Sequence, residues 1–204
     1  QEQDTAVTDG GTSVVDFELV AEANGGNNCF ETFDTQERCD RPVPIGVSTG
    51  HPAITAGAIG ARLTDGADVY ALSNNHVYAD EGNAAIGDEV IQPGTFDGGT
   101  TSTDVIGTLE AFVPIVFDDS TLNLVDAAIA LSSIADLGNA TPNNGYGIPT
   151  SQPYSGGFFN LRVQKHGRTT GPTNGKVKFI NATVRVGYDS GIARFSGQIV
   201  FGGG

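Results

Sequence analysis

Three histidines, His51, His76 and His166, are the only side chains in this 204-residue chain that can act as bases near pH 7 without a large shift in pKa. His76 comes at the end of a strongly apolar run, and Asp126 is a lone carboxylate entering another, at 127–131. Burying an unpaired carboxylate is costly, so Asp126 needs a hydrogen-bond donor, and an imidazole would serve. Spacing alone leaves both a His76–Asp126 pair and independent structural roles open.

The chain resembles trypsin-like (chymotrypsin-fold) serine proteases in three motifs that occur in the family's order. The segment YALSNNHV at 70–77 resembles the family's histidine motif, and the segment VDAAIA at 125–130 resembles its aspartate motif. Three further segments of this chain resemble a hairpin of the secreted bacterial proteases of the streptogrisin and α-lytic type. They are GRTTG at 167–171, GKV at 175–177 and NATV at 181–184. The resemblance extends over about residues 41–204.

The resemblance implies a serine endopeptidase that acts on peptide or protein substrates without a cofactor. His76 would be the general base and then the general acid, and Asp126 would fix its tautomer and stabilise the imidazolium. The family's nucleophile lies in a Gly-Asp-Ser-Gly segment, which we expect beyond Gly204, together with its oxyanion-hole donors. The 204 residues alone are therefore expected to be inactive.

The same resemblance implies an all-β fold of two antiparallel β-barrels, the second of them incomplete in this chain. Open strand edges and exposed apolar side chains would follow, so we expect a further C-terminal portion, or a second copy of the chain, to cover them. An alternative function is a catalytically inactive protease fold that serves as a binding or scaffold module.

Another serine suggests a different class of enzyme. Ser48 in GVSTG at 46–50 matches a nucleophile-elbow pattern, and with Asp126 and His166 it gives the order found in α/β-hydrolases. That motif requires a strand, a turn and a helix in a parallel sheet. Because prolines surround this segment and no amphipathic helix follows it, the hydrolase interpretation is disfavoured.

Short apolar runs separated by Gly, Asp and Asn turn signals predict strands throughout the chain after residue 41. The predicted strands cover 56–63, 68–72, 89–92, 105–112, 127–131, 160–163, 176–180, 183–186 and 193–201, with turns at 65–66, 97–99, 143–145 and 174–175. The stretch 122–137 is ambiguous between helix and strand. We expect an acidic N-terminal extension or propeptide-like segment at 1–40, a barrel carrying His76 and Asp126 at 41–135, and the incomplete barrel at 136–204.

Composition excludes several classes of protein. The 24 acids and 10 bases give a formal net charge of −14, which disfavours nucleic acids and anionic membrane surfaces as partners. No apolar stretch reaches the roughly 18 residues of a membrane span. The two cysteines, Cys29 and Cys39, favour a small disulfide loop and a secreted or extracytoplasmic protein, with free thiols as the alternative; a metal site is disfavoured.

Several further polar residues are expected to have structural roles. His166 and Arg168 belong to the predicted hairpin and would stabilise it. Four aspartates could bind a calcium ion through their carboxylates. No EF-hand-like spacing is present, so solvated acidic loops are expected instead. These aspartates are Asp97, Asp104, Asp118 and Asp119.

Overall fold

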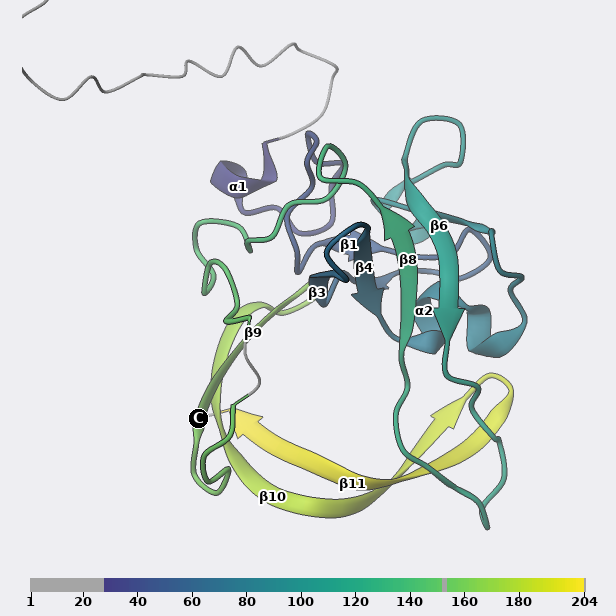
Figure 1. The fold of residues 1–204 in the computed structure, drawn as a ribbon, viewed down its shortest axis with the longest axis vertical. Helices are drawn as coiled ribbons and strands as arrows, with labels where there is room; N and C mark the ends of the chain where they lie inside the picture. Colours follow the sequence, from purple (N-terminus) through teal and green to yellow (C-terminus); the bar gives the residue numbers. More distant parts are fainter. Residues whose placement is uncertain (1–27, 152–153, 204) are drawn as a thin grey trace, which may run out of the picture.

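The computed structural model describes residues 28–151 and 154–203, which form a five-stranded sheet, a four-stranded sheet and a short two-stranded ribbon joined by loops (Figure 1). The first sheet has five strands in the order β3-β4-β8-β6-β5, and every neighbouring pair is antiparallel. Its strands are β3 (Ala61–Thr64), β4 (Val69–Ser73), β5 (Glu89–Ile91), β6 (Val105–Phe112) and β8 (Ala128–Ser132). The ambiguous stretch at 122–137 contains β8 and the two-residue strand Leu122–Asn123, with loops and turns in place of a helix.

A short ribbon links the two edges of this sheet. It consists of β1 (Ser48–Thr49) paired with β2 (Gly57–Ala58). Beyond β1, Gly50 bridges Ile91 at the end of β5, and beyond β2, the N–H of Gly60 donates to the carbonyl of Leu72 in β4 at 2.7 Å. Because both ribbon strands are only two residues long, no continuous strand ladder closes the five-stranded sheet into a barrel.

The second sheet has the order β7-β11-β10-β9 and is also open at both edges. Its strands are β7 (Leu122–Asn123), β9 (Arg162–Gly167), β10 (Gly171–Tyr188) and β11 (Gly191–Gly203). All pairs are antiparallel except β7 with β11. Figure 1 shows β10 and β11 as a long, curved hairpin that lies below the first sheet. The all-β prediction is confirmed, while the division at residues 135 and 136 stays a prediction.

Strand β10 differs from the sequence prediction in two places. Asn174 and Gly175 were predicted as a turn, but they pair with Gln164 and Val163 of β9, and the turn comes earlier, between Gly167 and Gly171. The two predicted strands around Asn181 form one strand instead. Asn181 has φ = 54°, a conformation that asparagine tolerates better than most residues, so the strand continues past it through shifts in register.

The helices are single turns at the ends of strands or in loops. They are α1 (Cys29–Thr32), α2 (Asn75–Tyr78) and the 3-10 turns η1 (Asp80–Gly82) and η2 (Thr95–Asp97). In the part of the chain that the structure describes, no helix is long and apolar enough to cross a membrane.

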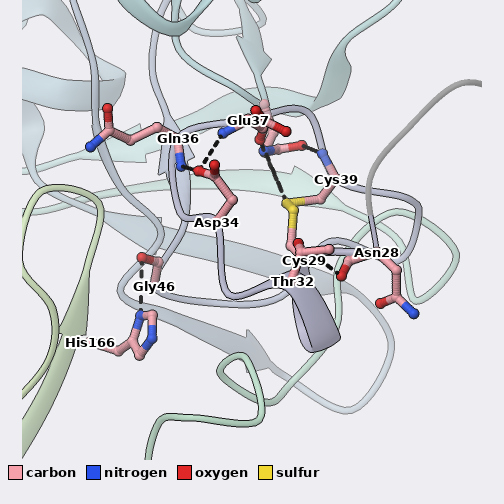
Figure 2. Close-up of a disulfide and its surroundings, with 10 residues drawn as sticks. Asn28, Cys29, Thr32, Asp34, Gln36, Glu37, Cys39, Gly46 and His166 are labelled. Carbon is pink, nitrogen blue, oxygen red and sulfur yellow. Dashed lines mark hydrogen bonds between the residues drawn. A yellow bond between two sulfur atoms is a disulfide. The ribbon is translucent and has the colours of Figure 1, made fainter.

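The larger hydrophobic core lies against the first sheet and includes the N-terminal disulfide. Cys29 of α1 and Cys39 are bonded, as predicted, with their Cα atoms 5.3 Å apart (Figure 2). Their exposed fractions are 1% and 4%, and both belong to the same buried cluster as Val43, Ile45 and Tyr78. Residues 29–39 of the predicted extension therefore pack onto this core, while residues 1–27 of that extension lie outside the described residues.

We predict that the disulfide contributes substantially to stability. Replacing both Cys29 and Cys39 with serine should lower the free energy of unfolding by about 2–4 kcal/mol, because the bond restricts a short loop in the unfolded chain. Urea denaturation of the variant and the parent protein measures this difference. Two titratable thiols in the denatured, non-reduced parent would contradict the bond itself.

The second sheet has a much smaller core. Its buried cluster consists of Ile115, Ala193 and Phe195, with partly buried aromatic and β-branched side chains packed around them. Large apolar side chains of β10 and β11 remain exposed, among them Phe179 at 65% and Phe201 at 48%. Exposed apolar side chains were expected on this sheet. What covers them, a further portion of polypeptide or a second copy, stays a prediction.

Candidate active site

His76 lies on the single turn α2, directly after β4. The turn is fixed by two asparagine side chains: Asn74 donates to the carbonyl of Asp126 at 3.0 Å, and the buried Asn75 donates to the carbonyl of Val113 at 2.7 Å. Tyr78, at the end of the turn, is fully buried in the core. With its neighbours held in this way, the turn presents the His76 ring at the surface, where 42% of the side chain is exposed.

Asp126 lies just before β8, and its carboxylate makes two contacts with His76. The ring Nδ1 of His76 lies 2.5 Å from Oδ2 of Asp126, and the backbone N–H of His76 donates to Oδ1 at 3.3 Å. Only 11% of the Asp126 side chain is exposed. The contact uses the ring nitrogen nearer the backbone, and the catalytic roles expected of the two residues stay a prediction.

A third residue, Tyr188, reaches Asp126 from the end of β10 in the second sheet. Its hydroxyl donates to Oδ2 of Asp126 at 3.0 Å, and its ring meets the His76 ring edge-on, with centroids 5.7 Å apart. The following turn is held by Glu81, whose carboxylate accepts the N–H groups of Asp189 at 3.0 Å and Ser190 at 2.7 Å. The sequence analysis missed Tyr188, because nothing in its local pattern shows that the second sheet approaches Asp126.

The surroundings of Asp126 keep it ionised. Burial by itself would raise the pKa of its carboxyl group, but the hydrogen bond and charge of His76, with the hydrogen bond from Tyr188, lower the pKa below its ordinary value. Burial and the neighbouring carboxylate raise the pKa of Tyr188, so its hydroxyl stays protonated as a donor. Asp126 can therefore only accept hydrogen bonds at neutral pH, and Nδ1 of His76 must carry the proton.

His51 also contacts a carboxylate, but both of its ring nitrogens are engaged. Its Nδ1 accepts the N–H of Ala53 at 3.1 Å, which leaves Nε2 to donate to Asp88 at 3.3 Å. His166 is 7% exposed and lies with Nδ1 3.4 Å from the carbonyl of Gly46 (Figure 2) and Nε2 3.2 Å from Oδ1 of Asn144. Among the described residues, only Nε2 of His76 has no hydrogen-bond partner, so this is the one histidine nitrogen available as a base.

We predict that His166 makes stability depend on pH. Burial lowers its pKa below 6.5, and the nearby Lys165 acts in the same direction. The unfolded chain therefore binds a proton more readily than the folded protein, and stability should fall as the pH drops below 6.5. Denaturant unfolding between about pH 7.5 and pH 5.5 should show a smaller loss for His166→Gln than for the parent. Equal losses would contradict the role given to His166.

The alternative serine site is not assembled. Ser48 donates to Oδ2 of Asp97 at 2.5 Å and accepts the N–H of Gly94 at 3.0 Å, so its hydroxyl is engaged in local structural contacts. Asp126 pairs with His76 rather than with His166. Together with the all-β fold, these contacts overturn the order Ser48, Asp126, His166 as a hydrolase triad.

Two aspartates expected in solvated loops are buried instead. Asp97 pairs with Arg168, and only 6% of its side chain is exposed. Asp104 is 1% exposed and accepts hydrogen bonds from Arg38 and Thr100, each at 2.8 Å. The prediction failed because an arginine distant in sequence neutralises each carboxylate. In the described segments, no group of three or more His, Cys, Asp or Glu side chains is arranged to hold a metal ion.

No protein-family model and no curated protein matches the chain, but solved structures of proteases are similar to it. Thermobifida fusca protease A is 18% identical over 76% of this chain and 67% of its own, with a TM-score of 0.49. A Nocardiopsis protease is 18% identical over 77% of this chain and 69% of its own, with a TM-score of 0.48. A glutamic-acid-specific serine protease is 19% identical over 74% and 69%, with a TM-score of 0.47. All three of these solved structures are proteases.

Proposed function

We propose that this chain belongs to a serine endopeptidase, which hydrolyses peptide bonds in proteins or peptides. In this proposal His76 is the general base, and Asp126 is the carboxylate that orients it. The observation that carries the proposal is the His76 ring, whose Nδ1 is bound to Asp126 while Nε2 is free. In this role His76 removes the proton of a serine hydroxyl as the serine attacks the scissile carbonyl. It then gives that proton to the leaving amine.

Asp126 supports both steps without exchanging the proton itself. Its carboxylate holds the imidazole with Nδ1 protonated, so that Nε2 keeps a lone pair for the serine proton. When Nε2 becomes protonated, the negative charge of Asp126 stabilises the imidazolium. The hydroxyl of Tyr188 restrains the same carboxylate oxygen from the other sheet, and we propose it as a positioning residue.

The nucleophile of this proposal is a serine outside residues 1–204. No serine hydroxyl among the described residues hydrogen-bonds to the His76 ring, and Ser48 is bound to Asp97. We also propose a secreted or extracytoplasmic location, because a structural disulfide such as Cys29–Cys39 forms and persists in an oxidising compartment.

The proposal is tested by labelling the complete gene product with a fluorophosphonate probe, which reacts with activated serines. We expect one adduct per molecule on a serine outside residues 1–204, and no adduct in the His76→Ala variant. Peptide mapping by mass spectrometry locates the modified residue. A folded protein that does not react would favour the inactive binding or scaffold module, and an adduct on Ser48 would contradict the assignment of the site.

A further inference from the structure

A basic groove lies on the second sheet, away from His76 and Asp126. It is a cavity of about 590 Å³, and its charged and amide side chains are Arg162, Gln164, Asn174, Lys176 and Lys178. Arg162 pairs with Lys176 and Gln164 with Asn174 across β9 and β10, and successive side chains of a strand alternate between faces. Arg162, Gln164, Asn174 and Lys176 therefore project from the same face of the sheet. Lys178 lies at an irregularity in the pairing of β10 with β11 and lines the same groove.

The three cations of this groove differ from all the other basic residues of the protein. Seven of the ten bases form an ion pair or a hydrogen bond within the described residues, and the three that form neither are Arg162, Lys176 and Lys178. The seven are Arg38, Arg41, Arg62, Lys165, Arg168, Arg185 and Arg194. The unpaired positive charge of a strongly acidic protein is thus gathered in one cavity.

This arrangement favours an anionic partner. Arg162 and Lys176 lie directly opposite each other, and like charges in such cross-strand pairs are destabilising. None of the residues lining the groove is acidic, although the whole chain has 24 acids. A negatively charged ligand in the groove would relieve the repulsion, and the long basic side chains can follow a partner of irregular shape.

We propose that the acidic segment at residues 1–27 of the same chain occupies the basic groove. This segment contains six acids and no base, namely Glu2, Asp4, Asp9, Asp16, Glu18 and Glu22. Residues 15–19 within it alternate between apolar and polar side chains, a pattern that favours an extended segment over a helix. The occupant thus has the charge that the groove lacks and a shape that a sheet can bind.

Tethering favours this segment over a separate acidic peptide. A free anionic peptide is repelled at long range by a protein of net charge −14, whereas a covalently attached segment is present at a high effective concentration. An extended chain of 27 residues spans up to about 90 Å, which is longer than a small domain is wide. The inference goes beyond the proposed peptidase activity and does not depend on it.

Zero-length crosslinking with a carbodiimide tests the proposal on the chain of 204 residues. The reagent joins a lysine amine to a carboxylate only where the two are in contact, with loss of the elements of water. The three lysines provide an internal control, because Lys165 is bound to Thr170 and does not line the basic groove. We expect crosslinks from residues 1–27 to Lys176 and Lys178, severalfold more abundant than crosslinks to Lys165.

Two further comparisons test whether charge holds the segment. Raising the salt concentration to about 1 M shortens the screening length to about 3 Å and should greatly reduce the yield at Lys176 and Lys178. Arg162→Gln leaves both lysines in place and should lower their yield severalfold. The matched variant Arg185→Gln, at an exposed ion pair with Asp119, should leave that yield unchanged.

Mixing ¹⁵N-labelled and unlabelled protein distinguishes the occupants. Crosslinked peptide pairs of a single isotope composition are expected for a segment bound to its own chain. Pairs of mixed composition would identify a second copy as the occupant and overturn the proposal. It is equally overturned if Lys165 reacts as readily as the groove lysines, or if no crosslink joins residues 1–27 to the groove.

Discussion

In the complete gene product, His76→Ala should lower kcat for peptide hydrolysis about a million-fold, and Asp126→Asn should lower it about ten-thousand-fold. The first change removes the only histidine nitrogen that has no hydrogen-bond partner among the described residues, and with it the proposed acceptor of the serine proton. The second puts an amide where Oδ2 accepts from Nδ1, which favours the wrong tautomer of the ring. Steady-state kinetics on a peptide substrate measures both effects.

A matched control is available in the contact between His51 and Asp88, the other pairing of a histidine with an aspartate among the described residues. His51→Gln should retain activity within a few-fold of the parent, because both ring nitrogens of His51 serve local structural contacts. If His51→Gln abolished turnover while His76→Ala did not, the assignment of the base would be wrong. Circular dichroism of each variant verifies that the fold is retained.

The second large effect is expected from the buried ion pair between Arg168 and Asp97. The guanidinium of Arg168 donates to both oxygens of Asp97, each contact at 2.5 Å, and its carbonyl accepts the hydroxyl of Thr35. Arg168 lies in the turn between β9 and β10, while Asp97 lies in η2 beside the first sheet. The pair therefore joins the two parts of the protein.

Arg168→Ala should destabilise the protein by about 3–5 kcal/mol, because it leaves the Asp97 carboxylate buried without its charged partner. The free energy of unfolding of Arg168→Lys should lie between those of Arg168→Ala and the parent. The ammonium group keeps the charge but cannot make the two parallel hydrogen bonds. Arg185→Ala removes an ion pair whose side chains are 58% and 59% exposed, and should cost less than about 1 kcal/mol. Similar losses for Arg168→Ala and Arg185→Ala in urea denaturation would contradict this role for the buried pair.

Local sequence patterns predicted most of the strands, and the resemblance to a known family predicted the central pair of the site. Apolar runs bounded by Gly, Asp and Asn correspond to β4, β5, β6 and β8 within one or two residues, because these strands bury alternating side chains in one core. The contact between His76 and Asp126 was expected from the resemblance of their two motifs to those of trypsin-like serine proteases. The disulfide followed from two cysteines separated by ten positions.

Contacts between distant segments could not be predicted in the same way. Tyr188 reaches Asp126 from 62 residues away and from another sheet, and Arg168 reaches Asp97 from 71 residues away. The residues next to Tyr188 and Arg168 in the sequence carry no information about which distant carboxylate each side chain contacts. The turn predicted at Asn174 failed for a related reason, since pairing with β9 outweighs the turn preference of an Asn-Gly pair.

The tautomer of His76 is the most direct test of the account, and ¹⁵N NMR of the histidine side chains in the 204-residue chain measures it. At neutral pH we predict a neutral imidazole with the proton on Nδ1, a strongly deshielded Nδ1 proton, and loss of that signal in Asp126→Asn. This result would show that Asp126 leaves Nε2 free to act as a base. A neutral ring with its proton on Nε2, or an Nδ1 signal unchanged in Asp126→Asn, would contradict the central claim.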